Sequence, residues 1–344
     1  MRAVVWDGFG VPPVVKAIPD PVAGPGQVLV RQAFSSVTAG DALMAAGRPY
    51  AFRPVFRAML RPPVLGREVA GTVVSVGDGV TAASVGDRVV GEAGQAWAEL
   101  VSVPAGDLAV VPDDVPLSLA ATLPVSAITA LQGLRAGGLR EGARVLVVGA
   151  SGGVGHFAVQ LAAAAGATVT GVCSGTKADE VRALGAERVI DYRRERFTDV
   201  GERYDLLFDL AGTEPVGACL GVLADDGRFV SSSGTNGGPW LGPLPRLLTV
   251  ALRSLVDRRL TVLGTSPDPD DLRTLVGHVQ RGELRPWVGQ QRDLDEAPEA
   301  VAAQVAGEVR GKTVLAIGGE DGDKASAARV MVPPSRVASP AASG

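Results

Sequence analysis

The sequence has few of the residues that build metal centres and disulfide frameworks. Its 344 residues include two cysteines and two histidines. Cys173 and Cys219 stand among small or apolar residues and cannot form a thiolate zinc site alone. A disulfide framework is excluded, and the start of the sequence has no secretory signal pattern. We therefore expect a reducing, cytoplasmic location.

Aromatic residues, unbalanced charge and long hydrophobic runs are also scarce. Aromatic residues make up 4% of the chain, and the net charge is −4. The mixed charge suggests no nucleic-acid partner, and no apolar run approaches the roughly 20 residues that cross a membrane. What is present is a hydrophobic content of 46% with 45 glycines and 24 prolines. Length and composition predict two domains with many turns around strands.

The most informative stretch is residues 144–177. Residues 144–149 (RVLVVG) form a short, β-branched, nearly all-apolar run, which predicts a buried parallel strand. A turn over 150–155 follows, then helical spacing over 156–165 and a second strand over 168–173. This order is that of one βαβ unit with a glycine-rich first turn.

That turn has the chemistry of a dinucleotide site. Gly152 lets the backbone approach a pyrophosphate, Gly155 lets the helix pack close to the strand, and the helix N-terminus supplies N–H donors. Ala150 replaces the first glycine of the G-x-G-x-x-G pattern. The alternative is a glycine-rich turn without a ligand, but the strand–turn–helix–strand context favours a cofactor. The residues expected to bind it are Ala150, Ser151, Gly152, Gly153, Val154 and Gly155.

The end of the second strand indicates which dinucleotide binds. An NAD site usually has Asp or Glu there, to hold the ribose 2′-hydroxyl. Here the sequence provides Ser174, Thr176 and Lys177 without an acid. Two hydroxyls and a lysine suit a 2′-phosphate, so we expect NADPH. A solvated surface lysine is the alternative interpretation of Lys177.

The predicted secondary structure changes near residue 120, from short strands to alternating helices and strands. Before it, short strand-like runs punctuated by Gly and Pro predict a compact β-barrel. These runs are residues 1–6, 27–33, 68–76, 87–90 and 98–103. An alanine-rich helix is expected over 119–135, and the segments after residue 177 continue a doubly wound parallel sheet. They are helices over 178–184, 215–223 and 270–281 and strands over 188–192, 204–210, 227–233 and 260–265, while a last strand over 312–317 is expected to return to the barrel.

Several motifs together resemble the medium-chain dehydrogenase/reductase superfamily, in its zinc-independent quinone oxidoreductase and enoyl reductase branch. The motifs are LGREVAG (65–71), VVSVG (73–77), VGDRV (85–89), AITA (127–130), GASGGVG (149–155) and LGAERVIDY (184–192). The resemblance implies an α/β fold, with a GroES-like β-barrel domain and a Rossmann doubly wound parallel-sheet domain that share a cleft for NADPH. It also implies homodimers joined through an edge strand near residues 260–266. The expected divisions are 1–120 (GroES-like domain), 121–285 (Rossmann domain), 286–318 (return segment of the substrate domain) and 319–344 (disordered tail).

The resemblance also bears on metal and catalysis. Zinc-dependent relatives carry Cys where this chain has Thr38 and His where it has Arg67, so we expect no metal. His156 is expected to be a helix-surface or phosphate-proximal residue, and His278 a surface one. Tyr50 resembles a family tyrosine that donates a hydrogen bond or a proton, and Thr38 is a second catalytic candidate; packing is the alternative role of Tyr50. The remaining cofactor candidates are Thr129, Tyr192, Ala211, Gly212, Gly234 and Thr235.

Two amphipathic segments, 50–63 and 239–260, are expected to shape an apolar substrate pocket. Their arginines would receive an acidic group or form a solvated face, and a membrane-surface helix is a further alternative. The sequence therefore predicts an NADPH-dependent, zinc-independent reductase of a hydrophobic or aromatic quinone or enone. A pathway-specific reductase of a polyketide-like intermediate, a non-catalytic NADPH sensor and an interaction module that keeps the fold are the alternatives.

The 2′-phosphate hypothesis predicts the effect of Lys177→Ala. A charge-assisted hydrogen bond contributes on the order of 1.5–3 kcal/mol. Its loss should weaken NADPH binding roughly tenfold or more, since about 1.4 kcal/mol is a factor of ten. NADH binding should barely change. Titrations of both nucleotides with wild type and variant measure this, and equal affinity of wild type for NADH and NADPH would contradict the assignment.

Overall fold

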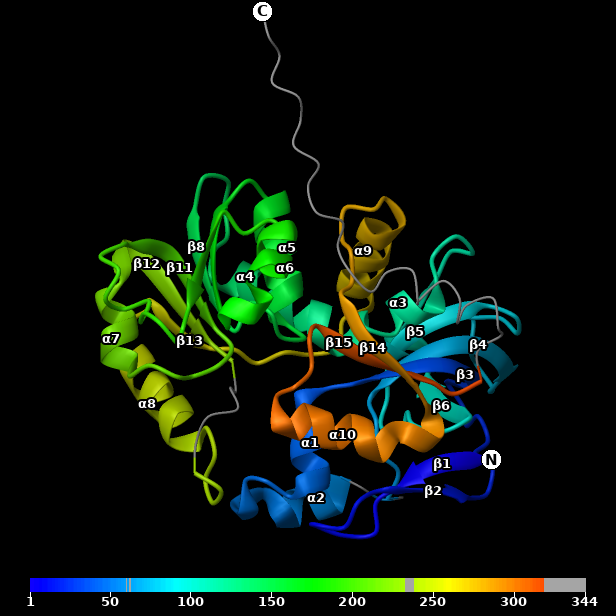
Figure 1. Cartoon of the computed structure of the whole chain (residues 1–344). Coiled ribbons are helices and arrows are strands. Elements are labelled where there is room, and N and C mark those ends of the chain that lie inside the picture. The colour runs from blue at the N-terminus through cyan, green and yellow to red at the C-terminus, as the bar shows by residue number, and fades with distance from the viewer. Residues whose placement is uncertain (60, 62, 233–237, 319–344) are drawn as a thin grey trace, which may run out of the picture.

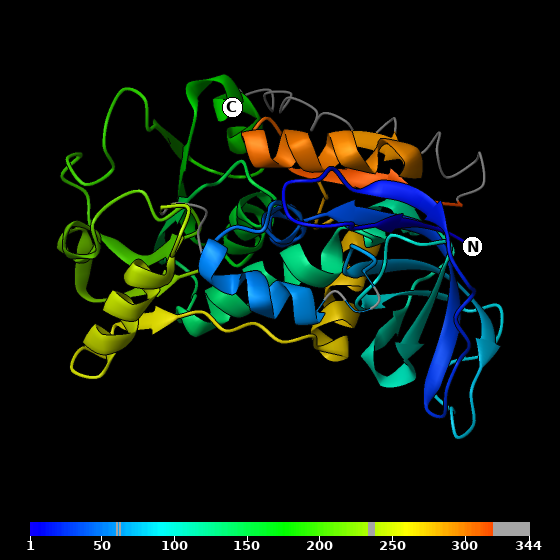
Figure 2. The ribbon, with the colours of Figure 1, turned by 90° about the horizontal axis from the view of Figure 1, so that it is seen from below.

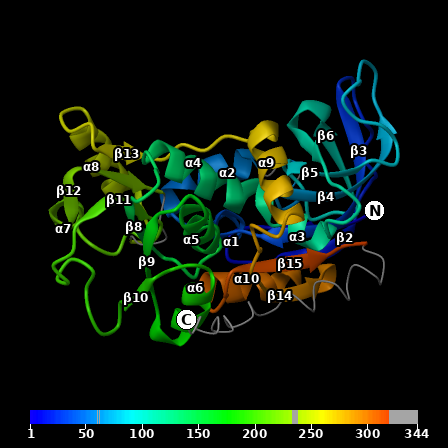
Figure 3. The same ribbon diagram turned by 90° about the horizontal axis from the view of Figure 1, so that it is seen from above.

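A computed structural model of the chain describes residues 1–59, 61, 63–232 and 238–318. It has two lobes, a parallel sheet flanked by helices and a barrel-like sheet (Figure 1), which also lie side by side when the molecule is seen from below (Figure 2). Seen from above, the helix α9 (Pro269–Gln280) lies between the two lobes (Figure 3). The fold class is the predicted one, a GroES-like barrel joined to a Rossmann domain.

The Rossmann sheet has six strands in the order β10-β9-β8-β11-β12-β13, and every neighbouring pair is parallel. Its central strands β8, β9 and β11 are mostly buried, as strands covered on both faces are expected to be. The strands of the sheet are β8 (Arg144–Val148), β9 (Thr168–Cys173), β10 (Arg188–Asp191), β11 (Tyr204–Asp209), β12 (Leu223–Ser231) and β13 (Leu260–Val262). The last strand is shorter than the 260–265 expected from the sequence.

Helices cover both faces of this sheet and complete two hydrophobic cores (Figure 1). Helices α4 and α5 contribute Leu134 and Phe157 to one core, whereas α7 and α8 contribute Cys219 and Val250 to the other. The helices of this domain are α4 (Ile128–Ala136), α5 (Gly155–Ala164), α6 (Ala178–Ala183), α7 (Val216–Gly221) and α8 (Leu244–Ser254).

The second domain is built on a seven-stranded sheet in the order β14-β15-β3-β4-β5-β7, with β6 also paired to β3. Its strands are β3 (Gln27–Val37), β4 (Glu68–Val76), β5 (Arg88–Glu92), β6 (Leu100–Pro104), β7 (Leu108–Val110), β14 (Val288–Asp293) and β15 (Lys312–Ala316). A separate hairpin consists of β1 (Arg2–Val5) and β2 (Val14–Ala17). The helices are α1 (Ala39–Ala46), α2 (Arg53–Met59), α3 (Leu117–Ala120) and α10 (Ala297–Ala306).

The single helix expected over residues 119–135 is wrong in its middle. The structure ends α3 at Ala120, forms a π-helical turn over Leu123–Ala127 and begins α4 at Ile128. Pro124 lies in this turn, and proline lacks the N–H that a continuous helix would use. The irregular turn directs the N–H of Val125 to Glu68, 3.0 Å away, instead of to its own helix.

A buried ion pair joins two strands that are far apart in the sequence. Lys312 Nζ of β15 lies 2.9 Å from Glu68 Oε2 of β4, and both side chains are almost wholly excluded from solvent. Lys312 Nζ also donates to Ser126 Oγ at 3.0 Å. Because Ser126 belongs to the π-helical turn before α4, this pair fixes the barrel sheet against the Rossmann domain.

Candidate functional site

The glycine-rich turn begins where β8 ends. The N–H groups of Gly149 and Ala150 both donate to Val172 O at 3.0 Å, which anchors the turn to β9. Gly149 has φ +90°, a conformation that favours glycine. A Cβ at Gly155 would lie 2.1 Å from Gly149 O, so only glycine fits there. The turn thus has the close backbone approach that a pyrophosphate needs, above the N-terminus of α5.

The other turn residues pack against the barrel domain. A Cβ at Gly153 would lie 3.4 Å from Lys312 Cδ and 3.6 Å from Ser126 Oγ. Gly311, the residue before β15, donates its N–H to Ser151 O at 3.1 Å. The predicted pyrophosphate turn is therefore in contact with the C-terminal strand of the barrel.

Of the two positions expected for His156, on the helix surface or near the phosphate, the first is wrong. His156 is fully buried, its Nδ1 lies 3.0 Å from Gly152 O, and its Nε2 has no partner within the described part of the chain. Burial lowers its pKa to about 3. The ring is therefore neutral near pH 7 and holds the turn rather than supplying charge.

The end of β9 gathers the predicted 2′-phosphate residues. Ser174 Oγ and Thr176 Oγ1 are 3.1 Å apart. Lys177 Nζ donates to Val309 O at 2.9 Å, and partial burial lowers its pKa, as does nearby Arg310. The lysine therefore bridges to the segment before β15 and would have to turn to meet a phosphate.

Sequence reasoning missed two residues at this edge. A Cβ at Gly175 would lie 2.4 Å from Asp191 Oδ2, so the neighbouring strand β10 brings a carboxylate to the end of β9. Asp191 Oδ1 accepts the N–H of Arg193 at 3.0 Å, and the Arg193 guanidinium lies 5.8 Å from the centre of the Tyr192 ring. Tyr192 itself is 55% exposed. Asp191 ends β10 and Arg193 follows it by two residues, but the proximity of Asp191 to Gly175 depends on strand order.

The end of β11 is closed by an ion pair that was also not predicted. Asp209 Oδ1 accepts the N–H groups of Ala211 and Gly212 at 3.2 and 2.8 Å. The other carboxylate oxygen pairs with Arg246 of α8, which also donates to Glu214 O. The predicted residues Ala211 and Gly212 are thus held by their own carboxylate. Gly234 and Thr235, predicted at the end of the next strand, lie outside the described residues.

The candidate residues nearest the domain junction lie on the π-helical turn, α4 and α1. Thr129 is buried in the first turn of α4 and donates its hydroxyl to Val125 O at 2.6 Å. Thr38 is the N-cap of α1: its Oγ1 accepts the N–H of Asp41 at 3.1 Å and donates to Asp41 Oδ2 at 2.6 Å. Burial raises the pKa of Asp41 to about 6, while its bonds to Thr38 oppose the shift.

Tyr50 joins the two domains. Its N–H donates to Pro239 O at 2.9 Å, and its ring meets that of Trp240 edge-on with centroids 5.4 Å apart. The guanidinium of Arg53 lies 4.3 Å from the centre of the Tyr50 ring. Tyr50, Ala39 and Ala42 line one cavity of about 390 Å³ together with residues before α8. The segments 50–63 and 239–260 therefore meet, and Tyr50 is enclosed by both.

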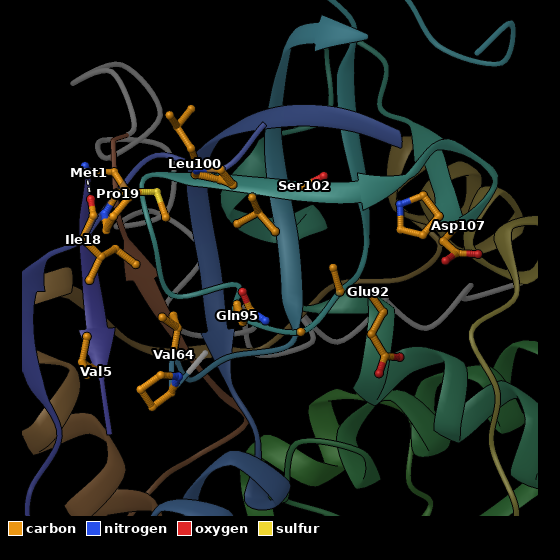
Figure 4. A pocket seen from close by; sticks show the side chains of 16 residues that line it. Met1, Val5, Ile18, Pro19, Val64, Glu92, Gln95, Leu100, Ser102 and Asp107 are labelled. Atoms are coloured by element: carbon orange, nitrogen blue, oxygen red, sulfur yellow. Dashed lines mark hydrogen bonds between the residues drawn. The ribbon is translucent and has the colours of Figure 1, made fainter. Parts of the chain in front are cut away.

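A larger cavity of about 750 Å³ lies in the barrel domain (Figure 4). Its wall is mainly apolar and includes Met1, Val5, Ile18, Val64 and Leu100. None of the predicted cofactor residues lines it. Within residues 1–59, 61, 63–232 and 238–318 there is also no group of three or more His, Cys, Asp and Glu side chains that could hold a metal ion. No helix in this part of the chain is long and apolar enough to span a membrane.

Comparison with known proteins identifies the family. A family model described as the alcohol dehydrogenase GroES-like domain matches residues 24–113, and one described as zinc-binding dehydrogenase matches residues 184–315. The chloroplast envelope quinone oxidoreductase homolog of Arabidopsis thaliana is 31% identical over 268 residues, which are 74% of this chain and 80% of that protein. The quinone oxidoreductase structure from Coxiella burnetii has a TM-score of 0.82 at 27% identity, and the match covers 92% of this chain and 99% of that one.

Polyketide synthase GfsB of Streptomyces halstedii is 34% identical over 264 residues, which are 74% of this chain but 5% of that protein. The chain belongs to the medium-chain dehydrogenase/reductase superfamily, in its quinone oxidoreductase and enoyl reductase-like branch. It is an oxidoreductase, its relatives imply a nicotinamide cofactor, and the glycine turn described above fits such a dinucleotide.

The raised pKa of Asp41 predicts a pH dependence of stability. A carboxyl that titrates near pH 4 in the unfolded chain and at about 6 in the fold favours the folded state only while it is protonated. Relative to Asp41→Asn, wild type should lose about 3 kcal/mol of unfolding free energy as pH rises from about 4 to above 6. Urea unfolding of both proteins across this range measures it. Parallel pH profiles would contradict the prediction.

Proposed function

We propose that this oxidoreductase is an NADPH-dependent, zinc-independent reductase of quinones or α,β-unsaturated carbonyl compounds. The observation that carries the proposal is the chemistry of the corner between Thr38 and Arg67. The hydroxyl of Thr38 and the guanidinium of Arg67 both lie within 4 Å of the point that a Cβ at Gly40 would occupy, and neither side chain is a usual zinc ligand. A guanidinium at this corner also opposes the binding of a divalent cation.

The chemistry that a bound nicotinamide would supply is hydride donation, while the protein supplies position and electrostatics. Hydride addition to a conjugated acceptor leaves negative charge on the carbonyl oxygen, where N–H and O–H donors stabilise it. An isolated ketone lacks this delocalisation and needs a stronger electrophile. A site with a guanidinium and hydroxyls is thus better suited to quinones and enones than to simple alcohols or ketones.

For the cofactor we propose that Ala150, Ser151, Gly152, Gly153, Val154 and Gly155 hold the pyrophosphate. Ser174, Thr176 and Lys177 would bind the 2′-phosphate, with Arg193 as a further cation at that edge. Thr129, Tyr192, Ala211 and Gly212 would line the rest of the dinucleotide. Burial and the cation Arg310 lower the pKa of Lys177, and an anionic phosphate nearby would raise it again by stabilising the charged ammonium.

Tyr50 and Thr38 are the proposed catalytic residues. Tyr50 lines the cavity between α1 and the segment before α8, where an apolar substrate would be enclosed. The hydroxyl of Thr38 already donates to Asp41, so it can donate to a substrate only when Asp41 is protonated. This makes Tyr50 the better proton donor near neutral pH.

We propose that the chain forms homodimers through β13, which is the last strand of the Rossmann sheet. The neighbouring helix α8 and the residues after it expose a row of large apolar side chains, and exposed apolar surface of this kind is typical of interfaces. The side chains are Leu248, Leu252, Leu255 and Val256. Sedimentation velocity measures the mass, and a monomer at micromolar concentration would contradict the proposal. The two buried, unlinked thiols fit the cytoplasmic location that we also propose.

A substrate panel tests the proposed reaction. We expect NADPH oxidation with ortho- or para-quinones or enones, little with simple aldehydes or saturated ketones, and no loss in a chelator. The absorbance of NADPH measures the rate. Chelator-sensitive oxidation of a simple alcohol would overturn both the substrate class and the metal-free mechanism. Binding of NADPH without turnover of any acceptor would favour a sensor, and turnover of enoyl thioesters alone would favour the polyketide-type reductase that the similarity to GfsB suggests.

The variant Tyr50→Phe provides the second arm of this experiment. Positioned general acids contribute about 10²–10⁴-fold to rate, so kcat should fall while NADPH affinity stays the same. Phe keeps the ring contacts with Trp240 and Arg53. An unchanged kcat would therefore leave Tyr50 with a packing role.

A further inference from the structure

Arg67 has a position that its ion pair does not explain. It precedes β4, its side chain is 41% exposed, and its Nη2 pairs with Glu92 of β5. Its Nη1 lies 3.9 Å from the point that a Cβ at Gly40 would occupy, and Thr38 Oγ1 lies 3.5 Å from the same point. The guanidinium therefore reaches past Glu92 to the first turn of α1.

The neighbours of Arg67 connect this corner to the proposed cofactor site. The next residue, Glu68, is buried and accepts the N–H of Val125 at 3.0 Å. Val125 O in turn accepts the hydroxyl of Thr129, and Lys312, the partner of Glu68, lies beside Gly153 of the cofactor turn. Arg67 thus directly precedes the carboxylate that connects the barrel sheet to this junction, and its guanidinium lies at the first turn of α1.

The charges around this junction are neutralised to different degrees. Glu68 is neutralised by Lys312 inside the protein, and Asp41 is fully buried and bonded to Thr38. Glu92 is mostly buried and touches one arm of the guanidinium, and Figure 4 shows its side chain directed away from Met1 and Leu100. An arginine has five N–H donors. Within the described part of the chain, Glu92 is the one hydrogen-bond partner of the Arg67 guanidinium.

We propose that Arg67 binds the carbonyl oxygen of the acceptor and stabilises the negative charge that develops on it. This rests on the function proposed above and specifies its substrate as a quinone, whose reduced anion is a phenolate. In that step a hydride, which a bound NADPH would supply while becoming NADP⁺, forms a new C–H bond at a carbon conjugated to the carbonyl or an O–H bond at the opposite quinone oxygen. A π pair moves through the conjugated system to the carbonyl oxygen at Arg67, and a proton then neutralises that oxyanion. Arg67 contributes a charge-assisted hydrogen bond to that oxygen.

Arginine suits this role for physical reasons. Its guanidinium is a planar fork of N–H donors, so it can hold Glu92 with one nitrogen while another contacts the substrate. Thr38 cannot supply the same stabilisation while its proton is directed to Asp41. The site therefore has a fixed positive group for an oxyanion and does not depend on rearranging a hydroxyl.

The experiment uses 4-nitrophenol, a phenol that ionises near neutral pH, as a stand-in for the reduced quinone. It is titrated on the full-length protein saturated with NADP⁺, and the phenolate absorbance reports ionisation of the bound molecule. In wild type we expect the pKa of bound phenol to fall by about one unit, which means that the phenolate binds about tenfold tighter than the neutral phenol does. Arg67→Met should abolish this shift, and Arg67→Lys should keep part of it.

The matched control is Arg140→Met. Arg140 is an exposed arginine that precedes β8, lies near the carboxylate of Asp205 and belongs to the end of β8 opposite the cofactor turn. This variant should titrate as wild type does. With a para-quinone as substrate, Arg67→Met should lower kcat/KM at least tenfold and Arg140→Met should not. If the Met variant is unstable, Arg67→Gln keeps polar donors without the charge and answers the same question.

A wild-type pKa shift that persists in Arg67→Met would overturn the inference, and so would the absence of phenolate binding by wild type. The titration needs no turnover, so its outcome is separate from the proposed function. If wild type lowers the phenol pKa through Arg67 but reduces no quinone or enone, the function fails and the anion site stands.

Discussion

The buried pair of Glu68 and Lys312 is the constraint on which the geometry of the molecule depends. Removing two opposite charges from water is costly, and attraction offsets the cost only when the remaining donors and acceptors are also satisfied. Here they are: Glu68 accepts from Val125, Ser36 and Lys312, and Lys312 donates also to Ser126. These contacts hold β3, β4, β15 and the turn before α4 in one arrangement. The same contacts fix the position of the cofactor turn, because Gly311 bonds to Ser151 and Lys312 lies beside Gly153.

Much of the fold could be predicted because its signals are local. A β-branched run, a glycine turn and helical spacing, all within one short stretch, predict the βαβ unit over 144–173. The structure confirms its strands and helix to within a residue or two. The helix α1 was missed although Thr38 and Asp41 have the spacing of a capping box, which is a sequence-level signal for a helix start. The division of the expected helix over 119–135 also had a local sign in Pro124.

Contacts between distant segments could not be predicted in this way. Glu68 and Lys312 are 244 positions apart, and nothing in either neighbourhood marks it as one half of a pair. The same holds for Arg246 and Asp209: the arginines of segment 239–260 were expected to receive an acidic group or to form a solvated face, yet Arg246 turns inward and closes the end of β11. Asp191 reaches Gly175 only because β10 lies next to β9. In each case the tertiary arrangement of strands and helices, not the residue type, creates the contact.

These distant contacts also determine the electrostatics of the junction. Each buried carboxylate there already has internal donors: Glu68 has Lys312 and two further groups, Asp41 has Thr38, and Asp209 has Arg246. The negative charge of these carboxylates is therefore compensated by internal donors, and its electrostatic effect on a ligand is weak. Arg67 differs because it is half-exposed and paired on one side. The N-termini of α1 and α5 add positive dipole ends near the same junction. A site with this balance favours anionic oxygen, on the phosphates of a dinucleotide and on a reduced carbonyl, over a bound cation.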